Sequence, residues 1–153
     1  MTIKALSIRQ PWAFAILMGC KPVENRSWPT HIRGPVLIHA GKTEDTSAIK
    51  HVLGRMAYQS NTAQHELWRL YRHHVHLGGI VGAVSITDCV TEHESQWFTG
   101  PWGYVLDLPT FCDFVPMKGQ LGFFTVPDDV AARVFAPPHH CGTDHRPALE
   151  TTA

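Results

Sequence analysis

The run Gly19–Gly34, GCKPVENRSWPTHIRG, is the stretch on which the interpretation of the whole chain depends. Its first half, Lys21–Trp28, places a lysine, a glutamate, an asparagine, an arginine and a tryptophan within eight positions. Charged side chains are rarely buried unless they are paired. A run of this composition is therefore unusual for a hydrophobic core and typical of a binding site.

The residues before this run predict a short helix over Pro11–Met18. Pro11 suits the first helical position, and Gly19 suits the residue just after the end. The helix is apolar on all sides, so protein or a ligand must cover it all round. Trp12, at its start, is the residue of this helix that fits a cleft.

Two strands are expected next. In Val23–Trp28, alternation places Glu24, Arg26 and Trp28 on one face. The second strand, Pro35–His39, has an apolar centre and is followed by polar residues and a glycine. Functional groups are common where a strand meets a loop, so this strand end is expected to face the same site.

The rest of the chain predicts an α+β domain over residues 1–135, built on a small, strongly curved, mixed or antiparallel β-barrel-like sheet with flanking helices. Residues 136–153 lack periodicity and are expected to form a flexible tail. The further helices expected are Asp45–Tyr58, Thr62–Val75 and Val130–Phe135, and the further strands are Ile3–Ile8, Ile80–Val90, Trp102–Leu106, Phe111–Pro116 and Leu121–Val126.

The charge balance limits the kinds of partner. The chain has 13 basic and 13 acidic residues and a formal net charge of zero. A nucleic-acid partner must therefore meet a local basic cleft. No cofactor is expected, and no metal site either, because the histidines near residue 74 and in the tail match no standard ligand spacing.

Cysteines and the first residues indicate a cytoplasmic location. The four cysteines form no CxxC pair, and the opening MTIKALSI has no basic and apolar leader. Reduced thiols are the simplest interpretation. No apolar run approaches the roughly 20 residues that cross a bilayer, so no membrane partner is expected.

Several segments together resemble the ASCH domain, a family of the PUA-like superfold. They are ALSIRQPWAFAILMGCKPVENRSW, RGPVLIHAGK, IVGAVSITDCV, GPWGYVLDL and KGQLGFFTV, spread over Ile3–Val126. The most specific part is Gly19-x-Lys21-x-x-Glu24-x-Arg26. The resemblance implies a small curved β-barrel with a cleft beside the first helix, and a protein that handles RNA or modified nucleosides.

One compact bacterial branch of this family hydrolyses N4-acetylcytidine, and other members are linked to RNA binding or RNA cleavage. That hydrolase branch uses a lysine, a threonine three residues later and a distant glutamate. Lys21 matches the lysine, whereas Glu24 stands in the place of the threonine. Either Glu92 or Glu94 is a candidate for the distant glutamate.

The candidate residues divide by chemistry. Cations and arginine forks suit phosphates, amides suit the edge of a base, and aromatic rings stack bases at about 1–3 kcal/mol each. The candidates for binding RNA or a nucleotide are Arg9, Gln10, Trp12, Asn25, Arg26, Trp28, Lys42, Trp102 and Tyr104. The candidates for catalysis are Lys21, Glu24 and His39.

Three functions remain open. The preferred one is binding of RNA or a modified nucleotide around the GxKxxExR segment. The alternative is a hydrolase acting on nucleic-acid components, either an N4-acetylcytidine amidohydrolase or a ribonuclease, with His39 as a general acid or base in the latter. A third is protein binding through the aromatic loop Trp97–Tyr104, which is either a flap over the core or a stacking platform. Glu24 and Arg26 can also simply form an ion pair while Trp28 packs on the core.

Overall fold

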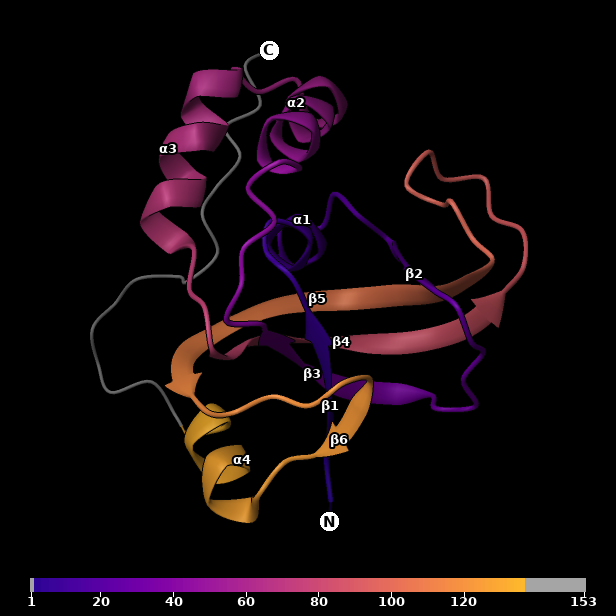
Figure 1. The fold of residues 1–153 in the computed structure, drawn as a ribbon, viewed down its shortest axis with the longest axis vertical. Helices are drawn as coiled ribbons and strands as arrows, with labels where there is room; N and C mark the ends of the chain where they lie inside the picture. Colours follow the sequence, from indigo (N-terminus) through magenta and orange to yellow (C-terminus); the bar gives the residue numbers. More distant parts are fainter. Residues whose placement is uncertain (1, 137–153) are drawn as a thin grey trace.

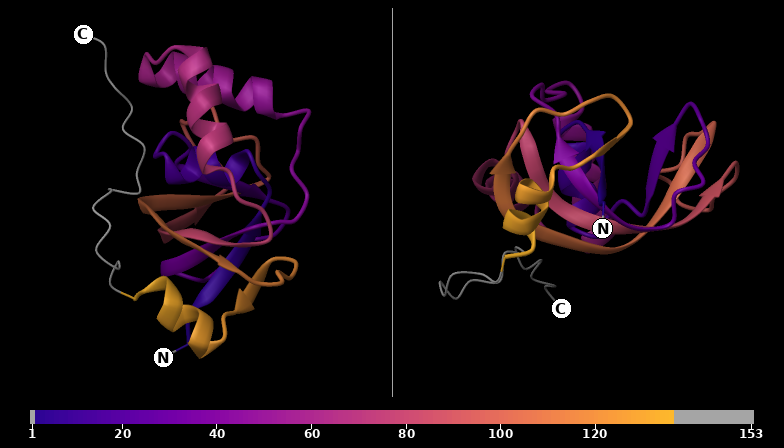
Figure 2. Two further views of the ribbon diagram at one scale, coloured as in Figure 1. Left: turned by 90° about the vertical axis from the view of Figure 1, so that its left-hand side faces the viewer. Right: turned by 90° about the horizontal axis from the view of Figure 1, so that it is seen from below.

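The structure, a computed structural model, describes residues 2–136, and a six-stranded sheet forms its centre (Figure 1). The strand order is β2-β5-β4-β3-β1-β6. Seen from below, the sheet curls into half a barrel (Figure 2). The strands are β1 (Lys4–Ile8), β2 (Val23–Arg26), β3 (Gly34–Ala40), β4 (Gly79–Val90), β5 (Trp102–Pro116) and β6 (Phe123–Thr125).

Strand direction makes the sheet mixed. β1 and β3 are parallel, and the other neighbouring pairs in the described residues are antiparallel. The chain between β1 and β3 is long enough for the crossover that a parallel pair requires. The curved, mixed sheet of an α+β fold that the sequence predicts is therefore confirmed.

The prediction of two separate strands, Trp102–Leu106 and Phe111–Pro116, is wrong, because β5 is continuous. Leu108 has a φ of 50°, and Leu108 and Pro109 fall between the residues that pair with β4. A β-bulge takes residues out of the ladder locally, so a strand can pass through a proline without ending. Leu108 and Pro109 therefore form an irregularity within one long strand.

Helix α1 (Trp12–Leu17) lies inside the curl of the sheet, and all of its residues after Trp12 are buried. Its first turn is held by Gln10, whose Oε1 accepts a hydrogen bond of 2.9 Å from the Phe14 backbone N–H. A Cβ atom at Gly82 of β4 would lie 2.6 Å from Cδ2 of Leu17. Only glycine lets the helix approach the sheet this closely, as the sequence suggests for this position.

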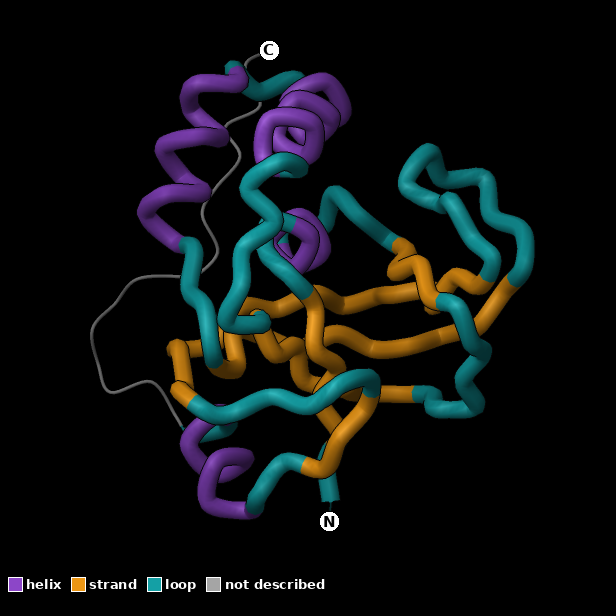
Figure 3. Tube along the Cα trace, viewed as in Figure 1, coloured by secondary structure: helices purple, strands orange, loops and turns teal. Residues whose placement is uncertain are grey.

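The other helices lie at the two ends of the molecule (Figure 3). Helices α2 (Ile49–Ser60) and α3 (Gln64–His74) pack together at one end, and α4 (Asp128–Val134) lies at the other. All three are close to their predicted positions. The apolar faces of α2 and α3 share one buried cluster with α1, which includes Phe14, Val52, Leu53, Met56, Leu67 and Tyr71.

Two further expectations concern membrane-spanning helices and the end of the chain. None of its helices is both long enough and apolar enough to span a bilayer. The predicted tail, with His139, His140, Cys141 and His145, lies outside the described residues except for Ala136.

Candidate functional site

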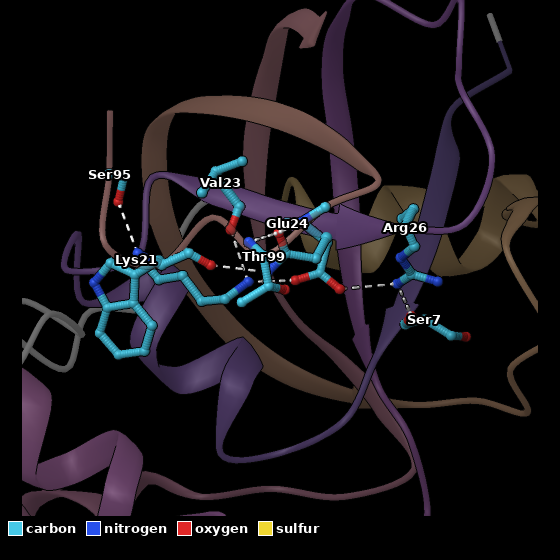
Figure 4. A network of polar contacts seen from close by, with 10 residues as sticks. Ser7, Lys21, Val23, Glu24, Arg26, Ser95 and Thr99 are labelled. Carbon is cyan, nitrogen blue, oxygen red and sulfur yellow. Dashed lines mark hydrogen bonds and ion pairs between the residues drawn. The ribbon is translucent and has the colours of Figure 1, made fainter. Parts of the chain in front are cut away.

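A buried carboxylate, Glu24, stands between two cations (Figure 4). Its Oε2 atom is 2.5 Å from Nζ of Lys21, and its Oε1 atom is 3.3 Å from Nη2 of Arg26. The three side chains are 11%, 2% and 15% exposed, in the order Glu24, Lys21, Arg26. The ion pair expected between Glu24 and Arg26 is present, and Lys21 extends it to a row of three charges.

The backbone around this row explains where Lys21 points. After α1, the backbone N–H groups of Cys20 and Lys21 both donate to the carbonyl oxygen of Ala15 at 3.1 Å. This turn directs the Lys21 side chain inward, where Nζ also donates to the Val23 carbonyl oxygen at 2.7 Å. Burial of the ammonium group is tolerable because the Val23 carbonyl oxygen and the Glu24 carboxylate both accept hydrogen bonds from it.

Arg26 connects two strands that are not neighbours in the sheet. Its Nη2 atom donates to the carbonyl oxygen of Ser7 in β1 at 2.7 Å, although β2 pairs only with β5. Its Nε atom is buried and has no hydrogen-bond partner among the described residues. A guanidinium carries five donors, so Arg26 retains some that the protein does not use.

Beside this row lies a cavity of about 580 Å³, here called cavity 1. Three exposed cations border it, namely Arg9, Lys42 and Lys118, and none of them forms an ion pair with another described residue. Glu24 is the one carboxylate among its lining residues in the described chain. The complete lining is Ser7, Ile8, Arg9, Trp12, Glu24, Arg26, His39, Gly41, Lys42, Thr43, Lys118, Gly119, Gln120 and Leu121.

A second cavity of about 340 Å³, here called cavity 2, lies on the other side of the row. Lys21 borders cavity 2, whereas Arg26 borders cavity 1, and Glu24 and Trp12 border both. The Trp12 ring has the Lys21 ammonium 5.8 Å from its centroid and the Trp97 ring edge-on at 6.5 Å. Trp12 and Glu24 therefore form the boundary between the two cavities.

His39 lies in the wall of cavity 1, with both ring nitrogens in contact with the protein. Nε2 is 2.9 Å from the Met117 carbonyl oxygen, and Nδ1 is 3.3 Å from the Ser7 hydroxyl. A carbonyl oxygen only accepts, so Nε2 carries a proton in this arrangement. The ring also packs against Gly119, where a Cβ atom would lie 2.6 Å from Nδ1.

Two of the polar residues predicted to bind a ligand, Gln10 and Asn25, instead form hydrogen bonds within the protein. Gln10 is buried. Its Oε1 atom accepts a hydrogen bond from the Phe14 N–H in α1, and its Nε2 atom donates to the His76 carbonyl oxygen at 3.3 Å. Asn25 holds the loop after β4, because its Nδ2 donates to the Trp97 carbonyl oxygen and its Oδ1 accepts from the Thr99 and Gly100 N–H groups. These amides have their hydrogen bonds satisfied within the protein.

The aromatic candidates also lie outside cavity 1, apart from Trp12. Tyr104 is fully buried, burial raises its pKa, and its hydroxyl donates to the Trp28 carbonyl oxygen at 2.9 Å. Trp28 is 49% exposed and Trp102 is half-buried, and neither borders cavity 1 or cavity 2. Trp97 is buried, with Nε1 donating to Oε1 of Gln59 at 2.9 Å, so this part of the aromatic loop covers the core.

Glu92 and Glu94, the two candidates for the distant glutamate, are exposed and border neither cavity.

Some residues that line the cavities were not among the predicted site residues. Lys118–Leu121 forms one wall of cavity 1, although a strand was expected from Leu121 and β6 begins only at Phe123. Helix α2 contributes His51 and Arg55 to cavity 2. The basic and glycine-rich composition of Lys118–Gly119 was the available signal, but its distance from the GxKxxExR segment in sequence concealed the connection.

The chain is similar to a known protein family. The family model of the ASCH domain matches residues 6–106, which is more than half of the chain. The match contains the row of three charges and most of the sheet, but it ends before Lys118–Leu121. A search of curated proteins finds no match to the chain.

Proposed function

The chain belongs to the ASCH-domain family, which is generally linked to RNA binding, and from this premise we propose that it binds RNA or a nucleotide in cavity 1. The observation that carries the proposal is the excess of cations around a cavity of about 580 Å³. This volume lies within the usual range for small-ligand sites. The only carboxylate of the described lining, Glu24, is already paired with Lys21 and Arg26.

Each part of a nucleotide has a complementary group in this cavity. Arg9 and Lys42 are exposed at its border and suit a phosphate, for which arginine offers a planar fork and lysine a point charge. Glu24 is an acceptor for the N–H donors of a base edge. Trp12, half-buried between the cavities, offers an aromatic ring against which a base can stack.

Calorimetric titration with single-stranded RNA and with nucleoside monophosphates tests the proposal. The variants Arg9→Ala and Lys42→Ala are each expected to weaken binding about tenfold or more, since a hydrogen bond to a charged group contributes about 1.5–3 kcal/mol. RNA affinity is expected to fall as salt concentration rises.

The matched control is Arg133→Ala, which removes an exposed arginine of α4 that borders neither cavity. This variant is expected to bind as the wild type does. Absence of binding in the wild type, or equal affinity in the wild type, Arg9→Ala and Lys42→Ala, contradicts the proposal.

A hydrolase is the second candidate, and the buried Lys21–Glu24 pair at 2.5 Å beside cavity 2 is the observation that favours it. In hydrolysis of an N4-acylated cytidine, Glu24 would take a proton from the water that attacks the acyl carbon, and Lys21 would stabilise the developing oxyanion. Glu24 would then pass the proton to N4 as the C–N4 bond breaks and cytidine leaves. A ribonuclease would instead need His39 to exchange a proton, for which its contact with Ser7 or with Met117 must open.

Incubation with N4-acetylcytidine and with end-labelled RNA tests these two activities. An amidohydrolase releases acetate and cytidine, and Glu24→Gln abolishes the release. A ribonuclease shortens the RNA, and His39→Gln abolishes the cleavage. A wild-type protein that leaves both substrates intact removes this second candidate without affecting the binding proposal.

A further inference from the structure

Cavity 2 continues into a groove along α2. This shallow groove, of about 610 Å³, is lined mainly by Lys50, His51, Arg55, Tyr58 and Gln96, and is called here the α2 groove. It shares His51, Arg55 and Gln96 with cavity 2. Cavity 2 in turn shares Trp12 and Glu24 with cavity 1. Each hollow therefore adjoins the next through shared lining residues.

The charges along this path have one sign. Lys50 and Arg55 border the α2 groove, and neither forms an ion pair with another described residue. No described carboxylate lines the path apart from Glu24, which Lys21 and Arg26 neutralise. In a chain of zero net charge, this is a local concentration of positive charge.

An aromatic ring and a fixed arginine lie on the α2 part of the path. Tyr58 is 88% exposed, although a large aromatic side chain of this kind is usually at least partly covered. Arg55 lies over the Trp97 ring at 5.0 Å and donates through Nη1 to the Gln96 carbonyl oxygen. These contacts hold the guanidinium at the groove, while its other donors remain for a ligand.

We propose, resting on the proposed function of cavity 1, that the ligand is a single-stranded polynucleotide that extends from cavity 1 past Trp12 and Glu24 into the α2 groove. One mononucleotide fills a single cavity of this size, but it does not account for the exposed ring and the cations beyond it. Cations suit the phosphates of such a strand, and the rings of Trp12 and Tyr58 suit its unstacked bases. A duplex keeps its bases stacked inside and offers none to Trp12 or Tyr58.

Fluorescence anisotropy with labelled oligonucleotides tests this extension. The probes are an oligouridylate of about eight nucleotides, the DNA oligomer of the same length, and unlabelled uridine 5′-monophosphate as a competitor. The variants are Lys50→Ala and Tyr58→Ala, whose side chains are exposed and whose loss leaves the fold intact. Arg69→Ala, on the exposed face of α3 and away from the path, is the control.

The oligomer is expected to bind at least tenfold more tightly than the monophosphate. Lys50→Ala and Tyr58→Ala are each expected to weaken oligomer binding about fivefold or more and to leave monophosphate binding unchanged. Arg69→Ala is expected to change neither. Comparison of the RNA and DNA oligomers shows whether the path selects the ribose.

Two other outcomes are distinguishable. Equal affinity for the oligomer and the monophosphate, or oligomer binding that is unchanged in both variants, overturns the extended path and leaves the cavity 1 proposal standing. A wild-type protein that binds neither probe overturns the cavity 1 proposal and the path with it.

Discussion

Glu24 pairs with Arg26 and with Lys21, and the sequence predicts the pair with Arg26. Alternation along a strand places Arg26 on the same face, whereas the contact with Lys21 depends on the turn between α1 and β2. The contacts of Arg26 with Ser7 and of His39 with Met117 were not predicted, because they join residues 19 and 78 positions apart. Local periodicity identified the charged residues. Their positions in the wall of cavity 1 depend on contacts between residues far apart in the sequence.

Replacing Glu24 with glutamine tests the buried row of charges. Glu24→Gln keeps the shape of the side chain and leaves Lys21 buried without its counter-charge. Removing one partner of a buried ion pair typically destabilises a protein by about 3–5 kcal/mol. Urea unfolding followed by circular dichroism is expected to show a loss of this order.

The double variant Lys21→Met/Glu24→Gln serves as its control. Because the uncompensated ammonium group is then absent, the double variant is expected to be more stable than Glu24→Gln alone. A Glu24→Gln variant that unfolds at the same urea concentration as the wild type contradicts the assignment of this row as a buried ion-pair network.

Two cysteines, the buried Cys20 and the half-buried Cys112, make the free energy of unfolding depend on pH in the alkaline range. Burial raises the pKa of Cys20 to about 11 and, together with nearby Asp113, that of Cys112 to about 12, from an ordinary pKa of 9.0. Above pH 9 the unfolded chain loses these protons while the folded chain retains them. The free energy of unfolding is therefore expected to be insensitive to these thiols below pH 9 and to fall from pH 9 to about pH 11.

Chemical unfolding across this pH range measures the effect. The decline is expected to be shallower in Cys20→Ala/Cys112→Ala, in which these two thiols no longer contribute. An equally steep decline in this variant and in the wild type contradicts the assignment to the two thiols.

At the scale of elements, helix and strand positions were largely predictable, and the positions of loops were not. The helix α1, its glycine stop and the small residues of β4 follow from local sequence signals. The segment 117–122 also has a local turn signal, but its place over cavity 1 depends on contact with His39. Asn25 appeared suited to a ligand because the loop that it holds lies 72 positions away at Trp97.

The close approach of this segment to His39 yields a prediction for Gly119. In Gly119→Ala the new methyl group collides with the His39 ring, so segment 117–121 must move. A lower melting temperature and weaker nucleotide binding are expected, since strain in a packed contact typically costs about 1–3 kcal/mol.

Gly41→Ala is the matched comparison, because a Cβ atom at this residue of the same cavity meets nothing within 4 Å. Its melting temperature is expected to stay close to that of the wild type. Equal melting temperatures for Gly119→Ala and the wild type would show that segment 117–121 does not rest on His39.

At the scale of the whole molecule, the fold class and the family were predictable, and the distribution of charge was not. Zero net charge excluded a globally basic protein and left only a local basic cleft. Cavity 1 combines residues from β1, β2, the end of β3 and the segment before β6. Only the curl of the sheet brings these four segments together, and the family match ends at residue 106, before the last of them.

The most direct test of the central claim is an NMR titration of the 15N-labelled protein with uridine 5′-monophosphate and with single-stranded RNA. The account predicts saturable shifts of the backbone amides at 7–9, 41–43 and 118–121, which border cavity 1, and of the Trp12 indole N–H. Amides of α4 are expected to keep their positions. Shifts confined to segments that do not border cavity 1, or no shift with either ligand, would contradict nucleotide binding at this site.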